Sequence, residues 1–228
     1  MSLHCRHQLV WLQAAAWPAL AATTGNDAAR SALAHWARHD LPLVVARQDQ
    51  TPVEDAAALG LPLPHTWGRQ RLRFLVPRAL FARADNFPHA RDVAPLLADA
   101  VRSAFIALCD GLAEQRLEPR VFGSYGWQLI TGLDHVRDGS DLDLLVPLRD
   151  ARSADDAERL MASFAADTLR LDGELVFPDG SALAWREWRP WRSGQVQHVL
   201  LKRIDGVLLA QGTQWLERAC EPCRVSHR

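Results

Sequence analysis

The chain has 228 residues, enough for one large domain or two small ones with a hydrophobic core. Hydrophobic residues make up 48% and charged residues 23%, and the formal net charge of −1 gives no global basis for binding nucleic acid or a membrane surface. The apolar stretch 9–22 is broken by Gln13 and Pro18 and is too short to cross a bilayer, so we expect neither signal peptide nor membrane span. We expect a cytoplasmic protein with reduced thiols. Cys109 is expected in the core, and the Cys220–Cys223 pair lacks a second ligand pair.

Residues 1–87 are predicted to form a small N-terminal α/β module that binds substrate or carrier protein. Residues 8–13 and 41–47 favour strands, and the alanine-rich segment 28–38 favours a helix after a turn at 25–27. A short helix is expected from Thr51 through Leu59, with Pro52 at an early position where its missing N–H costs nothing. Residues 61–64 are expected to be extended.

A strand with two different faces is predicted at residues 69–76. Arginines occupy one face, at positions 69, 71 and 73, and apolar residues occupy the other, at positions 72, 74 and 76. The arginines could contact a polyphosphate or the acidic surface of a partner. Alternatively, their charge only protects a solvated edge strand from aggregation.

Residues 88–228, after a hinge at 87–89, are predicted to form a catalytic domain with a mixed, twisted sheet flanked by helices. Helices are expected at 93–114, after Gly123-Ser124, and at 153–169, and strands at 120–122, 141–146, 196–202 and 207–209. A β-hairpin is expected from strands 171–177 and 182–188 around Pro178-Asp179-Gly180-Ser181. Its register would place Asp172 near Glu187 and Glu174 near Trp185.

Two neighbouring motifs carry the chemistry. Asp141 and Asp143 project from the same face of a strand, and two adjacent carboxylates repel each other unless a cation, usually divalent, lies between them. Sixteen residues earlier, Gly123-Ser124 ends a strand and begins a helix whose free N–H groups can bind phosphate. A metal-binding pair beside a phosphate-binding turn predicts a nucleotidyl transfer site.

These motifs resemble the signature of the DNA-polymerase-β-like nucleotidyltransferase superfamily. Within it, the segments 123–133 and 140–145 are similar to the malonate decarboxylase holo-[acyl-carrier-protein] synthases, also called phosphoribosyl-dephospho-CoA transferases. The likeness extends to residues 7–12, 60–64 and 185–187. It implies a donor, 2′-(5″-triphosphoribosyl)-3′-dephospho-CoA, and an acceptor serine on the acyl-carrier subunit of malonate decarboxylase.

The resemblance also implies a third metal-binding carboxylate, because two-metal phosphoryl transfer needs one. Glu187, within the matching Trp-Arg-Glu, is placed first, with Glu174 and Asp172 as alternatives on the strand where the superfamily carries this acid. The predicted substrate-binding residues are Gly123, Ser124, Trp127, Gln128, Ser140, Arg186 and Lys202. Trp127 could stack on a base or simply fill the core.

The predicted reaction is Mg²⁺-dependent, with two ions held by Asp141, Asp143 and the third acid, and it releases pyrophosphate. Two alternatives stay open: a nucleotidyltransferase that uses an NTP on a small molecule or protein, and a catalytically silent binding module of the same fold.

Overall fold

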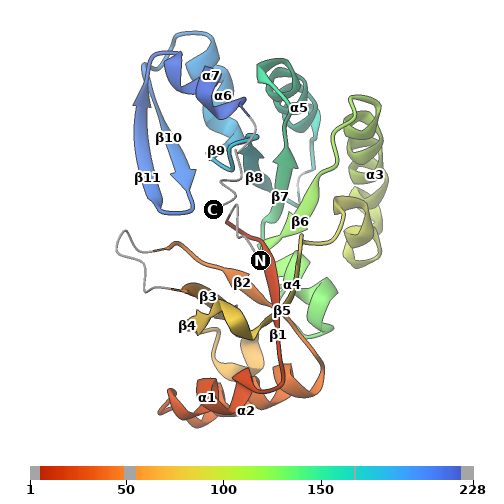
Figure 1. Cartoon of the computed structure of the whole chain (residues 1–228). Helices are drawn as coiled ribbons and strands as arrows, with labels where there is room; N and C mark the ends of the chain where they lie inside the picture. The colour runs from red at the N-terminus through yellow and green to blue at the C-terminus, as the bar shows by residue number, and fades with distance from the viewer. Residues whose placement is uncertain (1–5, 49–54, 167, 222–228) are drawn as a thin grey trace.

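The structure, a computed structural model, describes residues 6–48, 55–166 and 168–221, and it contains two β-sheets with associated helices (Figure 1). The first sheet has the strand order β4-β3-β2-β1-β5 and the second has the order β11-β10-β9-β8-β7-β6. The predicted α/β class is confirmed. None of the helices in the described ranges is long and apolar enough to cross a membrane.

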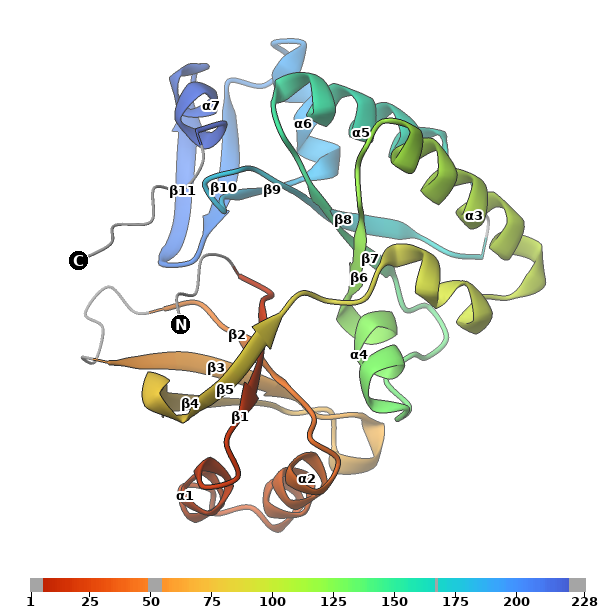
Figure 2. The same cartoon turned by 45° about the vertical axis from the view of Figure 1, so that its right-hand side comes forward.

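The first sheet is antiparallel and carries two helices on one face (Figure 2). Its strands are β1 (Leu9–Leu12), β2 (Leu43–Val45), β3 (Ala56–Pro62), β4 (Arg71–Pro77) and β5 (Phe81–Asp85). The helices are α1 (Ala16–Ala22) and α2 (Asp27–Arg38), and short 3-10 helices lie at η1 (His65–Trp67) and η2 (Arg78–Leu80). Asn26 caps α2, since its side-chain oxygen accepts a hydrogen bond from the Ala28 amide. The buried Trp36 of α2 anchors this helix on the sheet.

The register of β3 against β4 gives this sheet two different faces. Leu59 pairs with Phe74 and Leu61 with Leu72, and these apolar side chains pack into the core. Gly60 pairs with Arg73 and Pro62 with Arg71 on the opposite face, which lines a cavity. The predicted alternation of β4 is confirmed from Arg71 to Val76, whereas Arg69 precedes the strand.

The helix predicted from Thr51 to Leu59 is wrong where it can be compared. Residues 51–54 lie outside the described residues, and Ala56–Pro62 is strand β3. Alanine and leucine favour helices, but here they lie between β2 and β4 and hydrogen-bond on both sides. Tertiary pairing therefore outweighs the local preference.

The second sheet is mixed, as predicted, with β7 parallel to β8 and its other pairs antiparallel. Its strands are β6 (Arg120–Phe122), β7 (Leu142–Pro147), β8 (Leu171–Val176), β9 (Ala182–Ala184), β10 (His198–Arg203) and β11 (Gly206–Gln211). The helices are η3 (Ala90–Leu96), α3 (Asp99–Glu114), α4 (Gly123–Thr131), α5 (Ala151–Ser163), α6 (Trp185–Arg192) and α7 (Gln214–Ala219). Figure 2 shows α3, α5 and α6 on the side of this sheet away from the first sheet.

Three boundaries in this half were predicted incorrectly. The segment 93–114 is divided between η3 and α3, and Pro95, which cannot donate a backbone hydrogen bond, lies in η3. Helix α5 ends at Ser163, six residues before the expected end. The second hairpin strand ends at Ala184, because Trp185, Trp188 and Trp191 recur at helical spacing and are all buried.

Helix α4 connects the two halves of the molecule. Its Trp127 is buried in the core of the first sheet, edge to face with Phe87 at a centroid distance of 5.6 Å. On the other side, Gly126 lies so close to strand β6 that a Cβ atom there would be 2.4 Å from the Val121 carbonyl oxygen. The position of α4 therefore depends on both sheets.

Candidate active site

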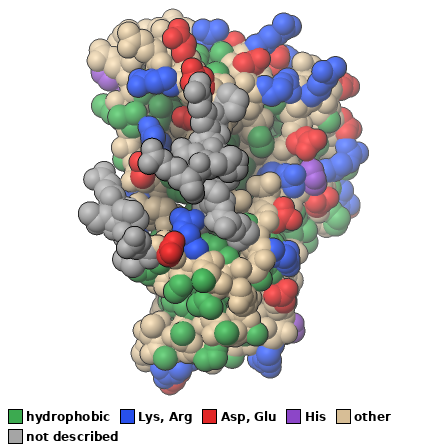
Figure 3. All heavy atoms as spheres, in the orientation of Figure 1, with side chains coloured by type: hydrophobic (Ala, Val, Ile, Leu, Met, Phe, Trp, Pro, Cys, Tyr) green, Lys and Arg blue, Asp and Glu red, His purple; other side chains and the backbone are tan. Residues whose placement is uncertain are grey.

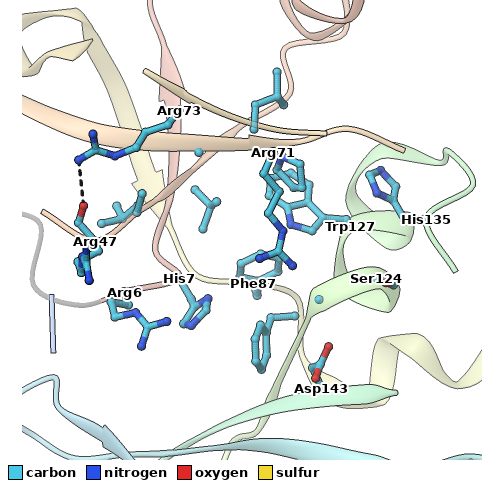
Figure 4. Close-up of a pocket in the computed structure, with 18 of the residues that line it drawn as sticks. Arg6, His7, Arg47, Arg71, Arg73, Phe87, Ser124, Trp127, His135 and Asp143 are labelled. Atoms are coloured by element: carbon cyan, nitrogen blue, oxygen red, sulfur yellow. Dashed lines mark hydrogen bonds between the residues drawn. The ribbon is translucent and has the colours of Figure 1, made fainter. Parts of the chain in front are cut away.

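A cavity of about 1080 Å³ lies between the two sheets, and its walls differ in charge. The acids that line it, Asp143, Asp172 and Glu174, all come from the second sheet. The first half of the chain contributes arginines instead: Arg6, Arg47, Arg69, Arg71 and Arg73. Figure 4 shows Arg47 and Arg73 at the side of the cavity away from Asp143, and Arg71 reaching in between them. A cavity with acids on one wall and cations on the other suits a ligand that carries both phosphates and metal ions.

The Gly123-Ser124 turn lies directly against Asp143. Phe122 is the register partner of Asp143, and Gly123 follows with a φ of +61°. A Cβ atom at position 123 would lie 1.9 Å from Oδ2 of Asp143, so only glycine leaves room for the carboxylate. Gly123 and Ser124 line the cavity and begin α4, whose first N–H groups have no partner within the helix. These groups can therefore bind an anion beside the acids.

Parallel pairing of β7 and β8 brings the acids together. Asp143 is the register partner of Asp172, and Asp141 precedes it by two residues. The close approach requires Gly173, where a Cβ atom would lie 2.2 Å from the Leu144 carbonyl oxygen. Burial, followed by the nearby carboxylates of Asp172, Asp141 and Glu174, raises the pKa of Asp143 to about 6. At this end of the cavity the effect of burial and of the neighbouring carboxylates on Asp143 outweighs that of the nearby Lys202.

Arg170 partly offsets the negative charge of these acids. Its guanidinium lies 3.5 Å from Oδ2 of Asp141 and 3.7 Å from Oδ2 of Asp172. In this conformation, no group of three or more histidine, cysteine or acidic side chains within the described ranges is arranged to hold a metal ion. The donor set itself suits a hard cation, since Mg²⁺ prefers carboxylate oxygens. Asp141, Asp143 and Asp172 are the residues that could hold one.

Glu187, the acid placed first from the sequence, does not join this group. It lies on α6, where its carboxylate accepts a hydrogen bond from the Leu200 amide at 3.2 Å, and it does not line the cavity. The expected register is wrong, because Glu174 pairs with Ala184 and the chain turns into a helix at Trp185. The structure brings Asp172, one of the two alternatives, to Asp143 instead.

Glu174, the other alternative, is engaged in ion pairs. It is only 5% exposed, and Nζ of Lys202 lies 2.7 Å away while Nε2 of His7 lies 3.5 Å away. Burial opposes its ionisation, but the contacts with His7 and Lys202 outweigh burial and lower the pKa of Glu174 to about 2. Lys202 also lines the cavity. His7 belongs to the first half of the chain, so its contact with Glu174 joins this half to the second sheet.

Four other predicted binding residues support the surrounding structure. Trp127 lines the cavity but is buried in the core, and Ser140 Oγ accepts a hydrogen bond from the Arg137 amide. The Gln128 side chain accepts hydrogen bonds from two backbone amides of the loop before β7, at positions 135 and 136. Arg186 donates to the Leu171 carbonyl at 2.8 Å and stacks over Trp185.

His135 was not among the predicted site residues, and it also lines the cavity. Burial lowers its pKa to about 4, so the imidazole is neutral near pH 7. Its Nε2 atom is buried and has no hydrogen-bond partner in the described part of the chain. The sequence places His135 only in a long spacer. Its burial depends on packing near Trp127, which no local pattern reveals.

An α/β fold whose cavity holds acids and the Gly123 turn on one side and arginines on the other fits a transferase of phosphorylated groups. Similarity to known proteins identifies the family of transferases. The model of the phosphoribosyl-dephospho-CoA transferase MdcG C-terminal domain matches residues 88–213, and that of the N-terminal domain matches residues 5–86. The chain belongs to the MdcG family of phosphoribosyl-dephospho-CoA transferases.

Curated relatives agree over nearly the full length. A phosphoribosyl-dephospho-CoA transferase of Xanthomonas campestris pv. campestris (strain 8004) is 37% identical over 219 residues, covering 94% of this chain and 98% of the relative. The protein of that name from Bradyrhizobium diazoefficiens is 37% identical over 225 residues, covering 94% of this chain and 93% of the relative. No solved structure matches the chain.

Proposed function

We propose that this protein transfers phosphoribosyl-dephospho-CoA from 2′-(5″-triphosphoribosyl)-3′-dephospho-CoA to a serine of the acyl-carrier subunit of malonate decarboxylase, in the cytoplasm. The name shared by its relatives supports the transferred group. The observation that supports the chemistry is the contact of the Gly123 turn with Asp143, whose register partner is Asp172. This contact places an anion-binding turn beside the acids at one end of the cavity.

The proposed reaction is a displacement at phosphorus. The serine Oγ forms a bond to the phosphorus attached to the 5″ oxygen of the ribose, and the bond from this phosphorus to the pyrophosphate breaks. The serine proton passes to Asp172, the register partner of Asp143, whose Oδ1 accepts a hydrogen bond from the Gly173 amide and whose Oδ2 lies 3.7 Å from the Arg170 guanidinium. Gly123 and Ser124 hold the leaving pyrophosphate with the N–H groups of α4.

Magnesium would add positive charge beside the carboxylates and the triphosphate. Asp141, Asp143 and Asp172 would hold two Mg²⁺ ions, which would stabilise the negative charge on the triphosphate. The raised pKa of Asp143 supports this proposal, because burial and the neighbouring carboxylates disfavour its ionised form in the protein alone.

Intact-mass spectrometry tests the proposal. The apo acyl-carrier subunit is incubated with this protein, Mg²⁺ and the triphosphoribosyl donor, and a parallel reaction contains ATP. We expect a mass gain equal to phosphoribosyl-dephospho-CoA with the wild type and none with Asp143→Asn. Adenylylation from ATP without transfer from the donor would contradict the substrate. No gain with either nucleotide would favour a silent binding module.

A further inference from the structure

The arginine wall of the cavity, defined as Arg47, Arg69, Arg71 and Arg73, is not used by the proposed reaction. We propose that it is a second anion site, which binds the diphosphate within the dephospho-CoA part of the donor. The inference rests on the proposed function, because that function supplies a donor with two separate phosphate groups. The triphosphate is held at the Asp143 end, and the diphosphate is held by the first sheet.

The wall is formed by the open face of the first sheet. Arg71 and Arg73 alternate with core residues on β4, and their register partners Pro62 and Gly60 add little bulk to the same face. Arg47 follows β2, and its carbonyl oxygen accepts a hydrogen bond from the Arg73 guanidinium at 3.4 Å. In Figure 4, Arg71 extends from β4 into the middle of the cavity. Arg71 thus points into the cavity, and the other three arginines of the wall line it.

Charge makes the wall an anion site. Among the described residues, no acid from the first half of the chain lines the cavity, and neither Arg69 nor Arg71 forms an ion pair with a carboxylate. Several fixed positive charges around a concave surface raise the local concentration of an anion. The planar guanidinium group binds phosphate through two parallel hydrogen bonds. A diphosphate matches both the charge and the geometry of these donors.

Shape favours a nucleotide over a folded protein as the occupant. The arginines line a cavity between two sheets, which a slender molecule enters more readily than the surface of a carrier protein does. The cavity of about 1080 Å³ is at the upper end of the range for small-molecule sites, so it can hold more than a triphosphate. The alternative role of these arginines, protection of the edge strand β4 from aggregation, would not require them to line a cavity.

Binding of dephospho-CoA, which carries the diphosphate but no triphosphate, tests the proposal without turnover. Titration calorimetry compares the wild type with Arg71→Gln and with the double variant Arg47→Gln/Arg71→Gln. Arg78→Gln is the matched control, because Arg78 belongs to the same half of the chain and does not line the cavity. We expect dephospho-CoA to bind about 10- to 100-fold more weakly to Arg71→Gln, still more weakly to the double variant, and normally to the control. Tripolyphosphate with Mg²⁺ should bind all four proteins within about threefold.

Three results would overturn the inference. The first is unchanged dephospho-CoA binding in Arg71→Gln, or no binding to the wild type at all. The second is an equal loss in Arg78→Gln, which would indicate only a general charge effect. The third is a raised KM for the carrier subunit with unchanged dephospho-CoA binding, which would assign the wall to the carrier protein. If dephospho-CoA binding depends on Arg71 but the wild type transfers no group, the proposed function fails and the anion site stands.

Discussion

The exchange Asp143→Asn should abolish transfer and yet stabilise the metal-free protein. Burial and the surrounding carboxylates raise the pKa of Asp143 from 3.8 to about 6. Each unit of pKa difference between the folded and unfolded states corresponds to about 1.4 kcal/mol. Ionisation of Asp143 in the folded protein therefore costs roughly 3 kcal/mol of unfolding free energy at pH values above 6.

The direction in which Asp143 changes the unfolding free energy with pH depends on which state binds its proton more tightly. Between pH 4 and pH 6 the folded protein binds the Asp143 proton more tightly than the unfolded chain does, so the contribution of Asp143 to the unfolding free energy falls as the pH rises. Asparagine does not titrate, and the variant lacks this contribution. The difference between variant and wild type should thus grow by roughly 2–2.5 kcal/mol from pH 4 to pH 7.5, whatever constant offset the substitution introduces.

Urea denaturation in EDTA across this pH range measures the difference, with transfer followed by intact mass. Asp138→Asn is the matched control, because Asp138 is an exposed carboxylate in the loop before β7. It should leave both the pH dependence and the transfer unchanged. Parallel stability curves for Asp143→Asn and the wild type would refute the reasoning, as would a variant that still transfers. Mg²⁺ should raise the thermal unfolding midpoint of the wild type and not that of Asp143→Asn.

Five further substitutions test the site and the fold. Asp172→Asn should lower kcat by about 100-fold or more, while Glu187→Gln should retain transfer within a few-fold; the opposite result would restore the acid on α6. Gly123→Ala and Gly139→Ala both place a side chain at positive φ, at a cost of about 1–2 kcal/mol in urea unfolding, but only the first crowds Asp143 and should abolish transfer. Trp127→Ala should lower the unfolding free energy by about 3–5 kcal/mol, and a loss below 1 kcal/mol would contradict its placement in the core.

Local patterns predicted those parts of the fold whose conformation depends on neighbouring residues. The alternation in β4 is visible in the sequence because one face packs on the core and the other does not. The Gly123-Ser124 turn and the strand carrying Asp143 were likewise predicted from short apolar runs with polar interruptions. The sequence also indicated the arginine face of β4, although it left open whether this face meets a ligand or only solvent.

Long-range pairing determined what the sequence analysis missed. Strand β3 begins with four helix-forming residues, Ala56 to Leu59, and its position between two other strands makes them extended. The choice between Asp172 and Glu187 depended on whether residues after Ala184 continued as a strand. It was decided by the parallel register of β7 with β8, which is set by residues almost thirty positions apart. The recurrence of tryptophan every three residues, at 185, 188 and 191, was the pattern that could have predicted helix α6.

The position of α4 limits how this chain can be shortened or recombined. The chain passes from the first sheet to the second half after β5, which suggests a cut at this point (Figure 1). A fragment beginning at residue 88 would nevertheless expose Trp127 on the helix that begins with the Gly123-Ser124 turn, and it would leave Glu174 without His7. Figure 3 shows charged side chains of both signs over the upper part of the face drawn, which carries the second sheet in Figure 1. Chimaeras that exchange the first sheet between relatives would need to exchange the partners of Trp127 with it, or the catalytic turn would shift.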